Sequence, residues 1–314
     1  MSPLYYVFRP HDINKTFLEY YFSTSKWHKF MKLNGNSGAR SDRFSIKDSE
    51  FVKMPIPSPK NEEQVKIGKL LSTVATYLAL QQHKLDQLNT LKKGLLQKMF
   101  ADKKHPQPEL RFKGFSGDWE QRKFSEILAK SDGLRRGPFG SALKKEFFIS
   151  SSEYTVYEQN NAIYNTWKTR YFITPEKFQE LHKFQLMPGD FILSGAGTIG
   201  RIAQVPANIT KGVFNQALIR IRINPEWMDK KFFLIWMQSE NMQRKLTQAN
   251  PGSAMTNLVP MSEIKKWEII IPSKAEQNKI GEFIQKLNSL IALHQRKLDK
   301  LKKMKAAYLN EMFV

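Results

Sequence analysis

The sequence lacks cysteine altogether, and its six histidines include no pair at metal-ligand spacing. Disulfides and thiolate metal sites are therefore excluded, and we expect no structural metal. The sequence also lacks any apolar run of the ~18 residues that a membrane-spanning helix requires, and no signal-peptide pattern stands at its start. We therefore expect a cytoplasmic protein with no membrane partner.

Acidic residues are few as well. The chain has 29 Asp and Glu against 50 Lys and Arg, which gives a formal net charge of +21 and an isoelectric point near 9.9. Such an excess favours a polyanionic partner, for which nucleic acid is the leading candidate. With 314 residues, 41% of them hydrophobic, the chain is long enough for two domains with cores of their own.

Motifs for catalysis are also missing. The sequence has neither a Gly-x-x-x-x-Gly-Lys-Ser/Thr loop for ATP nor the Asn/Asp-Pro-Pro-aromatic tetrad with which amino-methyltransferases hold a flipped base. Gly195-x-Gly197-x-x-Gly200 imitates a dinucleotide-binding fingerprint, but it joins two predicted strands, so we favour a tight hairpin with positive φ. Glu263-x-Lys265 lacks the Pro-Asp that precedes it in nucleases, and we interpret it as a solvated helix start.

An internal repeat organises the chain. Residues 63–100 align without a gap to residues 276–313 at an offset of 213, and each copy begins with Glu-Gln-x-Lys-Ile-Gly and ends in Met-Phe. The match continues more weakly upstream, where Pro10 corresponds to Pro225 after small shifts. The repeated unit is therefore larger than one helix.

Both copies carry apolar residues at heptad spacing, which predicts two long helices that form an antiparallel coiled coil. Polar residues interrupt the seam at Gln81 and His294 and again at Lys92 and Lys305, as in register-setting positions. A ligand or base role for His294 is the less favoured alternative, because no carboxylate or second histidine supports it. Antiparallel pairing places Ile67 near Met312, Met99 near Ile280, and Gln81 and His294 near the middle. The predicted seam consists of Ile67, Leu71, Val74, Leu78, Leu85, Leu88, Leu95 and Met99 in the first copy, and of Ile280, Ile284, Leu287, Ile291, Leu298, Leu301, Tyr308 and Met312 in the second.

A mixed α/β (α+β) domain is predicted between the two copies, because short β-type runs alternate with helical stretches there. The linker before it contains Pro106, Pro108, Gly114 and Gly117, which cannot continue a helix. Strands are expected at 147–150, 154–159, 169–174, 190–195, 200–206, 217–223 and 267–271, and helices at 175–184 and 226–246. The predicted division of the chain is 1–60, 61–100 (first coil helix), 101–111 (linker), 112–272 (the mixed domain) and 273–314 (second coil helix).

Several further segments accompany the duplicated helix. They are LRFKGFSGDWEQRKFSEI (110–127), RRGPFGS (135–141), YEQNNA (157–162), MPGDFILSGAGTIGRI (187–202), KGVFNQALIRIR (211–222) and the IPS-x-x-EQ junction (271–277). Together these segments resemble the specificity subunits of type I restriction-modification systems, and the resemblance covers nearly the whole chain. It implies target-recognition domains that each precede a long helix, with the helices paired antiparallel, and that read the two halves of a split DNA site.

The sequence departs from that family pattern in one respect. The first unit has no counterpart of roughly residues 112–215, so residues 1–60 correspond to the remnant of a first target-recognition domain, with one strand and a helix over about 12–33. Either the subunit is shortened, for example by gene rearrangement, or the absent part comes from another polypeptide.

Candidate DNA contacts are the polar and basic side chains on predicted loops and strand ends of the recognition domain. Residues 131–145 combine basic side chains with glycines that let backbone approach a phosphate. The amides and carboxylate of 157–162 can pair with base edges, although a structural polar turn is an equal alternative. The candidate residues are Arg135, Arg136, Ser141, Lys144, Lys145, Glu158, Gln159, Asn160, Asn161, Ser194, Thr198, Arg201, Gln216, Asn250 and Ser253.

The resemblance implies a non-catalytic subunit that directs partners to double-stranded DNA. These partners are two modification (methyltransferase) subunits that use S-adenosylmethionine and a restriction (translocase and nuclease) subunit that uses ATP and Mg²⁺, so the chain itself binds no cofactor. Self-association into a dimer would pair two intact recognition domains on an inverted repeat. The rival interpretation is a coiled-coil scaffold that binds nucleic acid without sequence preference.

Overall fold

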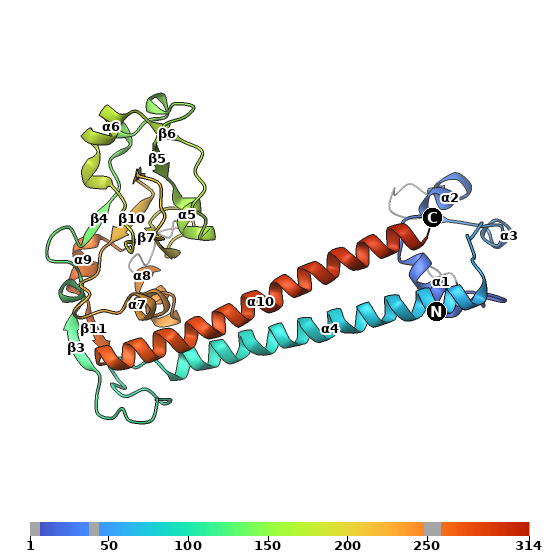
Figure 1. Ribbon diagram of the computed structural model, residues 1–314, viewed down its shortest axis with the longest axis horizontal. Coiled ribbons are helices and arrows are strands. Elements are labelled where there is room, and N and C mark those ends of the chain that lie inside the picture. Colours follow the sequence, from blue (N-terminus) through green and yellow to red (C-terminus); the bar gives the residue numbers. More distant parts are fainter. Residues whose placement is uncertain (1–6, 38–43, 248–258, 314) are drawn as a thin grey trace. The chain divides into compact units, whose positions relative to one another are not determined.

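The computed structural model describes residues 7–37, 44–247 and 259–313 (Figure 1). The chain forms two compact units. Unit 1 consists of Met1–Asn89 and Ser289–Val314, and unit 2 of Thr90–Asn288. Both long helices, α4 (Asn61–Lys98) and α10 (Lys274–Met312), contribute to both units.

Unit 1 is built around the beginning of α4 and the end of α10. Short elements precede α4: α1 (Lys15–Phe22), α2 (His28–Asn34), β1 (Asn36–Ser37) paired with β2 (Phe44–Ser45), and α3 (Asp48–Phe51). The core of the unit joins Phe17, Leu18 and Tyr21 of α1 to Leu71 of α4 and Phe313 just beyond α10. The single helix expected over about 12–33 is therefore two helices, separated by a turn at 23–27.

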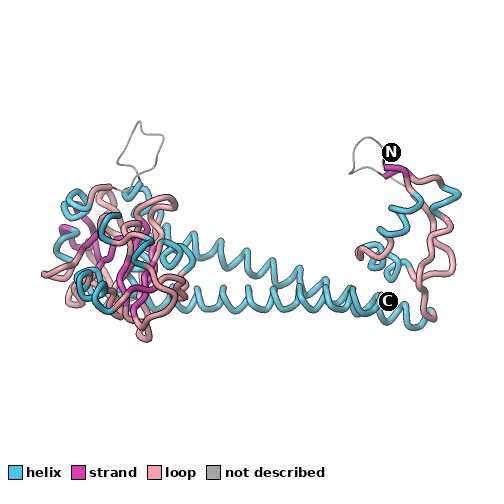
Figure 2. Tube along the Cα trace, turned by 90° about the horizontal axis from the view of Figure 1, so that it is seen from above, coloured by secondary structure: helices cyan, strands magenta, loops and turns pink. Residues whose placement is uncertain are grey.

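The two long helices lie side by side and antiparallel, which confirms the predicted coiled coil (Figures 1 and 2). In unit 1, Ile67 and Met312 belong to one hydrophobic cluster. In unit 2, Met99 and Ile280 share another. The predicted seam residues are buried or half-buried in both copies.

The polar seam positions Gln81 and His294 contact each other, with 2.7 Å between Gln81 Oε1 and His294 Nδ1. The two polar groups thus pair with each other inside a largely apolar interface, an arrangement that favours one register. The side chain of Lys92 is half-buried, and this burial lowers the pKa of its ammonium group.

Unit 2 contains three small sheets among short helices. In the central sheet, β4 (Leu134–Arg136), β10 (Leu218–Ile221), β7 (Phe191–Ser194) and β8 (Ile202–Gln204) lie in that order, all antiparallel. A second sheet has the order β6 (Phe172–Ile173), β5 (Tyr154–Tyr157), β9 (Gly212–Phe214), with β5 and β9 parallel. The third pairs β11 (Glu268–Ile271) with β3 (Glu120–Lys123). The helices are α5 (Gln159–Tyr164), α6 (Pro175–Glu180), α7 (Lys230–Met237), α8 (Glu240–Thr247) and α9 (Met261–Lys266).

The glycine motif at 195–200 forms the turn between β7 and β8. These strands are antiparallel, and Leu193 of β7 pairs with Ile202 of β8. Gly197 and Gly200 have φ of +59° and +80°, a region that disfavours side chains with a Cβ. The interpretation as a hairpin is therefore confirmed.

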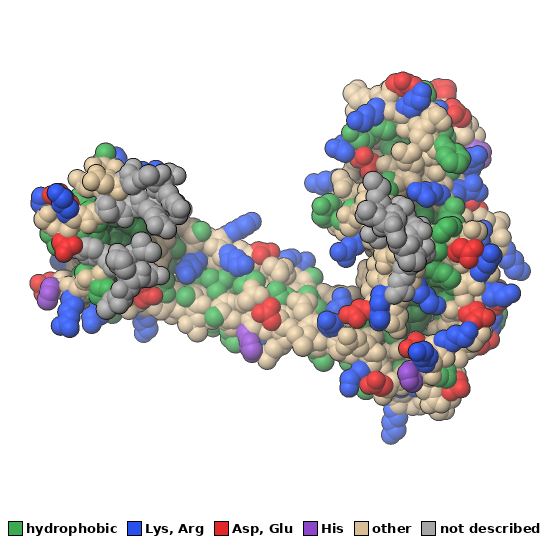
Figure 3. Space-filling view, turned by 180° about the vertical axis from the view of Figure 1, so that it is seen from behind, with side chains coloured by type: hydrophobic (Ala, Val, Ile, Leu, Met, Phe, Trp, Pro, Cys, Tyr) green, Lys and Arg blue, Asp and Glu red, His purple; other side chains and the backbone are tan. Residues whose placement is uncertain are grey.

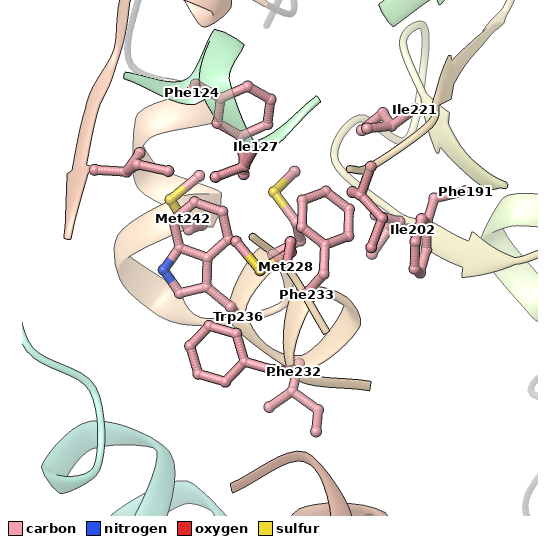
Figure 4. Packing of buried hydrophobic residues seen from close by; sticks show 14 of the residues in the cluster. Phe124, Ile127, Phe191, Ile202, Ile221, Met228, Phe232, Phe233, Trp236 and Met242 are labelled. Atoms are coloured by element: carbon pink, nitrogen blue, oxygen red, sulfur yellow. The ribbon is translucent and has the colours of Figure 1, made fainter. Parts of the chain in front are cut away.

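The main core of unit 2 packs α7 against the central sheet and against the 3₁₀ helix at 124–127 (Figure 4). Phe124 and Trp236 are stacked with ring centroids 6.1 Å apart, and Phe191 lies 4.8 Å from Phe233. The beginning of α10 completes this core with Ile280 and Ile284.

Several short elements differ from the sequence-based expectation. Residues 147–150 form no strand; a 3₁₀ turn (Lys145–Phe147) precedes an isolated bridge between Ile149 and Phe172. The helix expected over 226–246 is divided into α7 and α8. Strands β3, β4 and β9 were not predicted, because runs such as GVF at β9 are too short to show an alternating pattern.

The internal repeat extends to side-chain contacts. Gln64 Oε1 accepts a hydrogen bond from the backbone N–H of Asn14, the N-cap of α1, at 2.8 Å. Gln277 Oε1 accepts one from Asp229, the N-cap of α7, also at 2.8 Å. Helices α1 and α7 are therefore equivalent parts of the repeat. Each is attached to its long helix through a glutamine at the same position of the repeat.

Candidate DNA interface

A groove of about 1030 Å³ opens in unit 2 beside β4 and the loop that follows it. Its charged lining residues are four basic ones and a single acidic one: Lys130, Asp132, Arg135, Arg136 and Lys265. Lys130, Arg136 and Lys265 are exposed to solvent. Lys and Arg side chains are also scattered over the visible face of unit 2, with Asp and Glu among them (Figure 3). The electrostatic character of this groove suits a phosphate backbone.

The β4 strand holds two neighbouring arginines beside β10, with Arg135 paired to Arg220 and Arg136 to Ile219 in the strand register. The strand then turns sharply at Gly137, where an added Cβ would lie 1.9 Å from the carbonyl oxygen of Asn215. Only glycine fits there. The backbone contact at Gly137 therefore fixes this wall of the groove. The two arginines lie on the edge strand of the sheet and not on a loop.

Asp132 pairs with three arginines, of which Arg135 lines the groove. Its carboxylate forms ion pairs with Arg135, Arg220 and Arg222. Arg220 is only 1% exposed and also donates to the backbone oxygens of Lys183 and Gln185, at 3.1 and 2.6 Å.

The charge balance around Asp132 leaves an excess of positive charge. Burial is the largest effect on Arg220 and lowers the pKa of its guanidinium. The pKa of Arg222 is raised, mainly by its hydrogen bonds to Asp190 at 2.7 and 2.8 Å. The three arginines face two carboxylates, those of Asp132 and Asp190, so the cluster has one net positive charge.

Three of the candidate DNA contacts meet in the groove: Arg135, Arg136 and Gln216 all line it. Arg136 and Gln216 are exposed, while Arg135 is half-buried against Asp132. Ser141, Lys144 and Lys145 follow at 141–145 and are also exposed, with Lys144 Nζ 3.5 Å from Glu146. These six residues remain candidates.

The candidates at 158–161 form the beginning of α5 rather than a loop. Asn161 is 3% exposed and donates to the backbone oxygens of Thr166 and Lys168, and Glu158 caps the helix and pairs with Arg170. Gln159 donates to the backbone oxygens of Ala196 and Thr198. These three side chains bind groups of the protein itself, as expected if 157–162 is a structural polar turn. Of this segment, the exposed Asn160 remains a candidate for DNA contact.

The remaining candidates lie on the β7–β8 hairpin or outside the described residues. Ser194 is fully buried; its hydroxyl donates to the Thr198 carbonyl at 2.5 Å and accepts from the Arg201 N–H at 2.9 Å, so we assign it to the turn rather than to DNA. Thr198 and Arg201 are exposed. Asn250 and Ser253 lie outside the residues that the structure describes.

Lys130, Asp132, Phe139 and Lys265 were missed by sequence reasoning. Lys265 belongs to the triplet interpreted as a solvated helix start, and it is exposed on α9 at the groove. Phe139 is 88% exposed at the groove edge, an unusual state for a large aromatic side chain. The motif RRGPFGS contained this signal, since an aromatic residue between glycines in a basic turn has no helix or strand face to bury it.

The described residues offer neither a metal site nor a membrane span. Among 7–37, 44–247 and 259–313, no group of three or more His, Cys, Asp or Glu side chains is placed to hold a metal ion. Within the same ranges, no helix combines the length and apolar character needed to cross a membrane.

A family model described as the type I restriction modification DNA specificity domain matches residues 1–90 and 117–303. The chain belongs to this family. The resemblance inferred from the sequence motifs is thereby confirmed. The matched ranges include the groove, both Glu-Gln-led helix starts and the short elements before α4.

Curated relatives are longer than this chain. It is 22% identical to the type I restriction enzyme MjaVIII specificity subunit of Methanocaldococcus jannaschii over 272 residues, which cover 83% of the chain and 61% of that protein. It is also 22% identical to the putative type I restriction enzyme MjaX specificity subunit of the same organism over 281 residues, with 85% and 60% covered. The chain thus spans about three fifths of the length of these relatives.

Solved structures share the fold. The HsdS subunit from Thermoanaerobacter tengcongensis superposes with a TM-score of 0.53 at 15% identity, covering 95% of this chain and 69% of that one. The type I restriction-modification S subunit from M. genitalium gives 0.58 at 12% identity, covering 96% and 73%. These likenesses support the mixed recognition domain with a long antiparallel helix pair.

Proposed function

We propose that the chain is a sequence-specific DNA-binding specificity subunit of a type I restriction-modification complex. The observation that carries the proposal is the basic groove of unit 2, which lies within the segment matched by the DNA specificity domain model. Arg136, Lys130 and Lys265 are exposed there for phosphate contacts, and Gln216 offers an amide able to pair with a base edge.

The division of labour follows from the same proposal. The chain supplies the DNA address and carries out no chemistry itself. Modification subunits that use S-adenosylmethionine dock on the helix pair and methylate adenine, and a restriction subunit that uses ATP and Mg²⁺ translocates and cleaves DNA. Binding should depend strongly on salt, because neutralising six to ten phosphates implies a loss of ~10³–10⁵ in affinity between 50 and 200 mM.

Co-purification with a modification subunit, followed by sequencing of adenine methylation across a genome, tests the proposal. We expect the reconstituted complex to methylate one defined DNA sequence and the isolated chain to show no methylation, cleavage or ATPase activity. Methylation by the isolated chain would overturn the assignment. DNA binding without any sequence preference would favour the scaffold alternative.

A further inference from the structure

The three arginines beside the groove are not equally satisfied by the two aspartates that face them. Asp190 accepts two hydrogen bonds from Arg222, at 2.7 and 2.8 Å. Asp132 accepts from the buried Arg220 through Oδ2 and from Nε of Arg135 through Oδ1. Because three guanidinium charges face two carboxylate charges, one positive charge is left over. Of the three arginines, Arg135 is the one that lines the groove.

Arg135 carries this surplus charge. Its side chain is 34% exposed, and Asp132 is its acidic partner within the described part of unit 2. That carboxylate is shared with Arg220, which is 1% exposed and for which the loss of a charged partner would cost more. The residues of unit 2 that the structure does not describe, 248–258, contain no Asp or Glu and so supply no second carboxylate. An anionic or acceptor-rich ligand in the groove would therefore meet the net charge of the cluster at Arg135.

The guanidinium of Arg135 is held in one orientation. Its backbone is fixed by the pairing of β4 with β10, its Nε is bound by Asp132, and its Cζ lies 5.9 Å from the centre of the Phe184 ring. Asp132 itself has φ of +63°, a left-handed conformation that is costly for a residue with a Cβ and persists where the surrounding structure requires it. The two terminal nitrogens of Arg135 form no hydrogen bond within the described residues, so they are the atoms left for a ligand.

We infer that Arg135 reads a guanine in the DNA half-site and that Asp132 is the residue that positions it. Guanine presents two acceptors, O6 and N7, on its major-groove edge, and two parallel N–H groups of a guanidinium match them. Adenine has an amino group in place of O6, which would face the donors of Arg135 and offer no acceptor there. The inference rests on the proposed function, because it assigns one base to the groove already proposed to bind DNA.

A base edge suits Arg135 better than a phosphate group does. Phosphate oxygens point in several directions and can be contacted by freely moving cations, which the groove has in the exposed side chains of Lys130 and Lys265. Arg135 is partly withdrawn from solvent and already oriented, so a bidentate contact restricts its side chain little further. A planar group fixed in this way discriminates between base edges.

The variant Arg135→Met keeps an unbranched side chain of similar length and removes every donor. It should fold, because the other two arginines of the cluster then face two carboxylates with no net charge. Lys130→Met is the matched control, since it removes one exposed cation of the same groove. Urea unfolding of the two variants establishes that both are folded before DNA binding is measured.

The half-site is first defined by selection from a pool of random duplexes with the full chain. A labelled duplex that carries it is then compared, by fluorescence anisotropy, with duplexes in which each guanine of either strand is replaced in turn by 7-deazaguanine, which lacks N7 but still pairs with cytosine. We expect one replacement to weaken binding by the unchanged chain about tenfold, the effect of losing one hydrogen bond from a charged donor. Arg135→Met should bind the natural and the substituted duplex equally well. Lys130→Met should bind both more weakly and keep the tenfold ratio.

Asp132→Asn tests the positioning role. Asn also tolerates the left-handed backbone, and the charge of Arg135 remains. This variant should lower the tenfold ratio without lowering the affinity for duplex DNA, because removal of a carboxylate makes the groove more positive. An unchanged ratio would contradict the role assigned to Asp132.

Three results would overturn the assignment of Arg135 and leave the proposed function standing. They are a half-site without guanine, an absence of any effect of 7-deazaguanine, and a tenfold ratio that survives Arg135→Met, as expected if Arg135 contacted a phosphate. Selection by the unchanged chain that enriches no sequence would instead remove the proposed function and this inference with it.

Discussion

The two copies of the Glu-Gln-led helix share their first motif and their heptad spacing but lie in different surroundings. In unit 2, Glu276 is buried against Arg111. In unit 1, Glu63 is exposed beside a remnant that contains α1 and a few short elements. Both copies nevertheless keep the glutamine that holds the neighbouring helix cap. Both copies therefore keep the same glutamine contact, although the glutamates beside it differ in burial.

The largest difference between the copies is expected at the two glutamates. Glu276→Gln leaves the Arg111 guanidinium partly buried without its charged partner, which costs about 3–5 kcal/mol of unfolding free energy. Glu63→Gln at the exposed site should change stability by less than about 0.5 kcal/mol. Urea unfolding of both variants measures this difference. Equal losses of unfolding free energy would mean that Glu276 and Glu63 have similar surroundings.

The seam should respond alike in both copies. Leu85 and Leu298 occupy equivalent positions and are 5% and 2% exposed. Truncation of either to Ala removes buried methyl groups and creates a cavity, at a cost of about 2–5 kcal/mol. Thermal and urea unfolding of the two single variants should give similar losses. A large loss at one position and none at the other would contradict the equivalence of the helices.

DNA affinity should depend on the groove cations of unit 2 and not on the exposed cations of unit 1. Arg136→Ala removes an exposed groove cation, which should weaken duplex binding and, if the guanidinium pairs with a base, cost about 1–3 kcal/mol of discrimination at one base pair. Lys69→Ala, an exposed cation on α4, is the matched control and should leave binding unchanged. Fluorescence anisotropy with a labelled duplex measures both; equal weakening would argue for nonspecific attraction.

The smallest expected difference concerns the two helix glycines. A Cβ on Gly281 would lie 2.9 Å from Lys231 Cβ and Phe232 N, whereas one on Gly68 would lie 3.3 Å from Thr16. Gly281→Ala should therefore destabilise by about 1–2 kcal/mol through overpacking. Gly68→Ala should be close to neutral, because the helix propensity gained, up to about 1 kcal/mol, offsets the tighter contact. Melting temperatures compare the two, and a more harmful Gly68→Ala would reverse our ranking of the contacts.

The best-predicted parts of the fold are those in which the local sequence pattern alone specifies the structure. The heptads of α4 and α10 and the glycine hairpin at 195–200 were predicted because long periodicity and positive φ leave a direct mark on residue choice. The groove was predicted only in part. Arg135, Arg136 and Gln216 stood in suggestive segments, but Lys130 and Lys265 join them through tertiary folding alone.

Two of the candidate DNA contacts are buried polar residues. Asn161 and Ser194 have side chains typical of DNA contacts, yet they satisfy backbone groups inside the domain. Arg220 shows the converse: a charged residue in an IRIRI strand is expected at the surface, yet it is 1% exposed. Its two terminal nitrogens bind Asp132 and two carbonyl oxygens, whereas its Nε has no partner among the described residues. Such partners cannot be read from one sequence, since they lie 35 to 88 positions away.

Selection of binding sites from a pool of random duplexes tests the central claim most directly, namely that one complete recognition domain reads one DNA half-site. The selection is carried out with the full chain at a concentration where light scattering shows a monomer. We predict enrichment of a single short block of bases, lost in Arg136→Ala and kept in Lys69→Ala. Absence of any enriched sequence, or two blocks at a fixed spacing bound by the monomer, would contradict it.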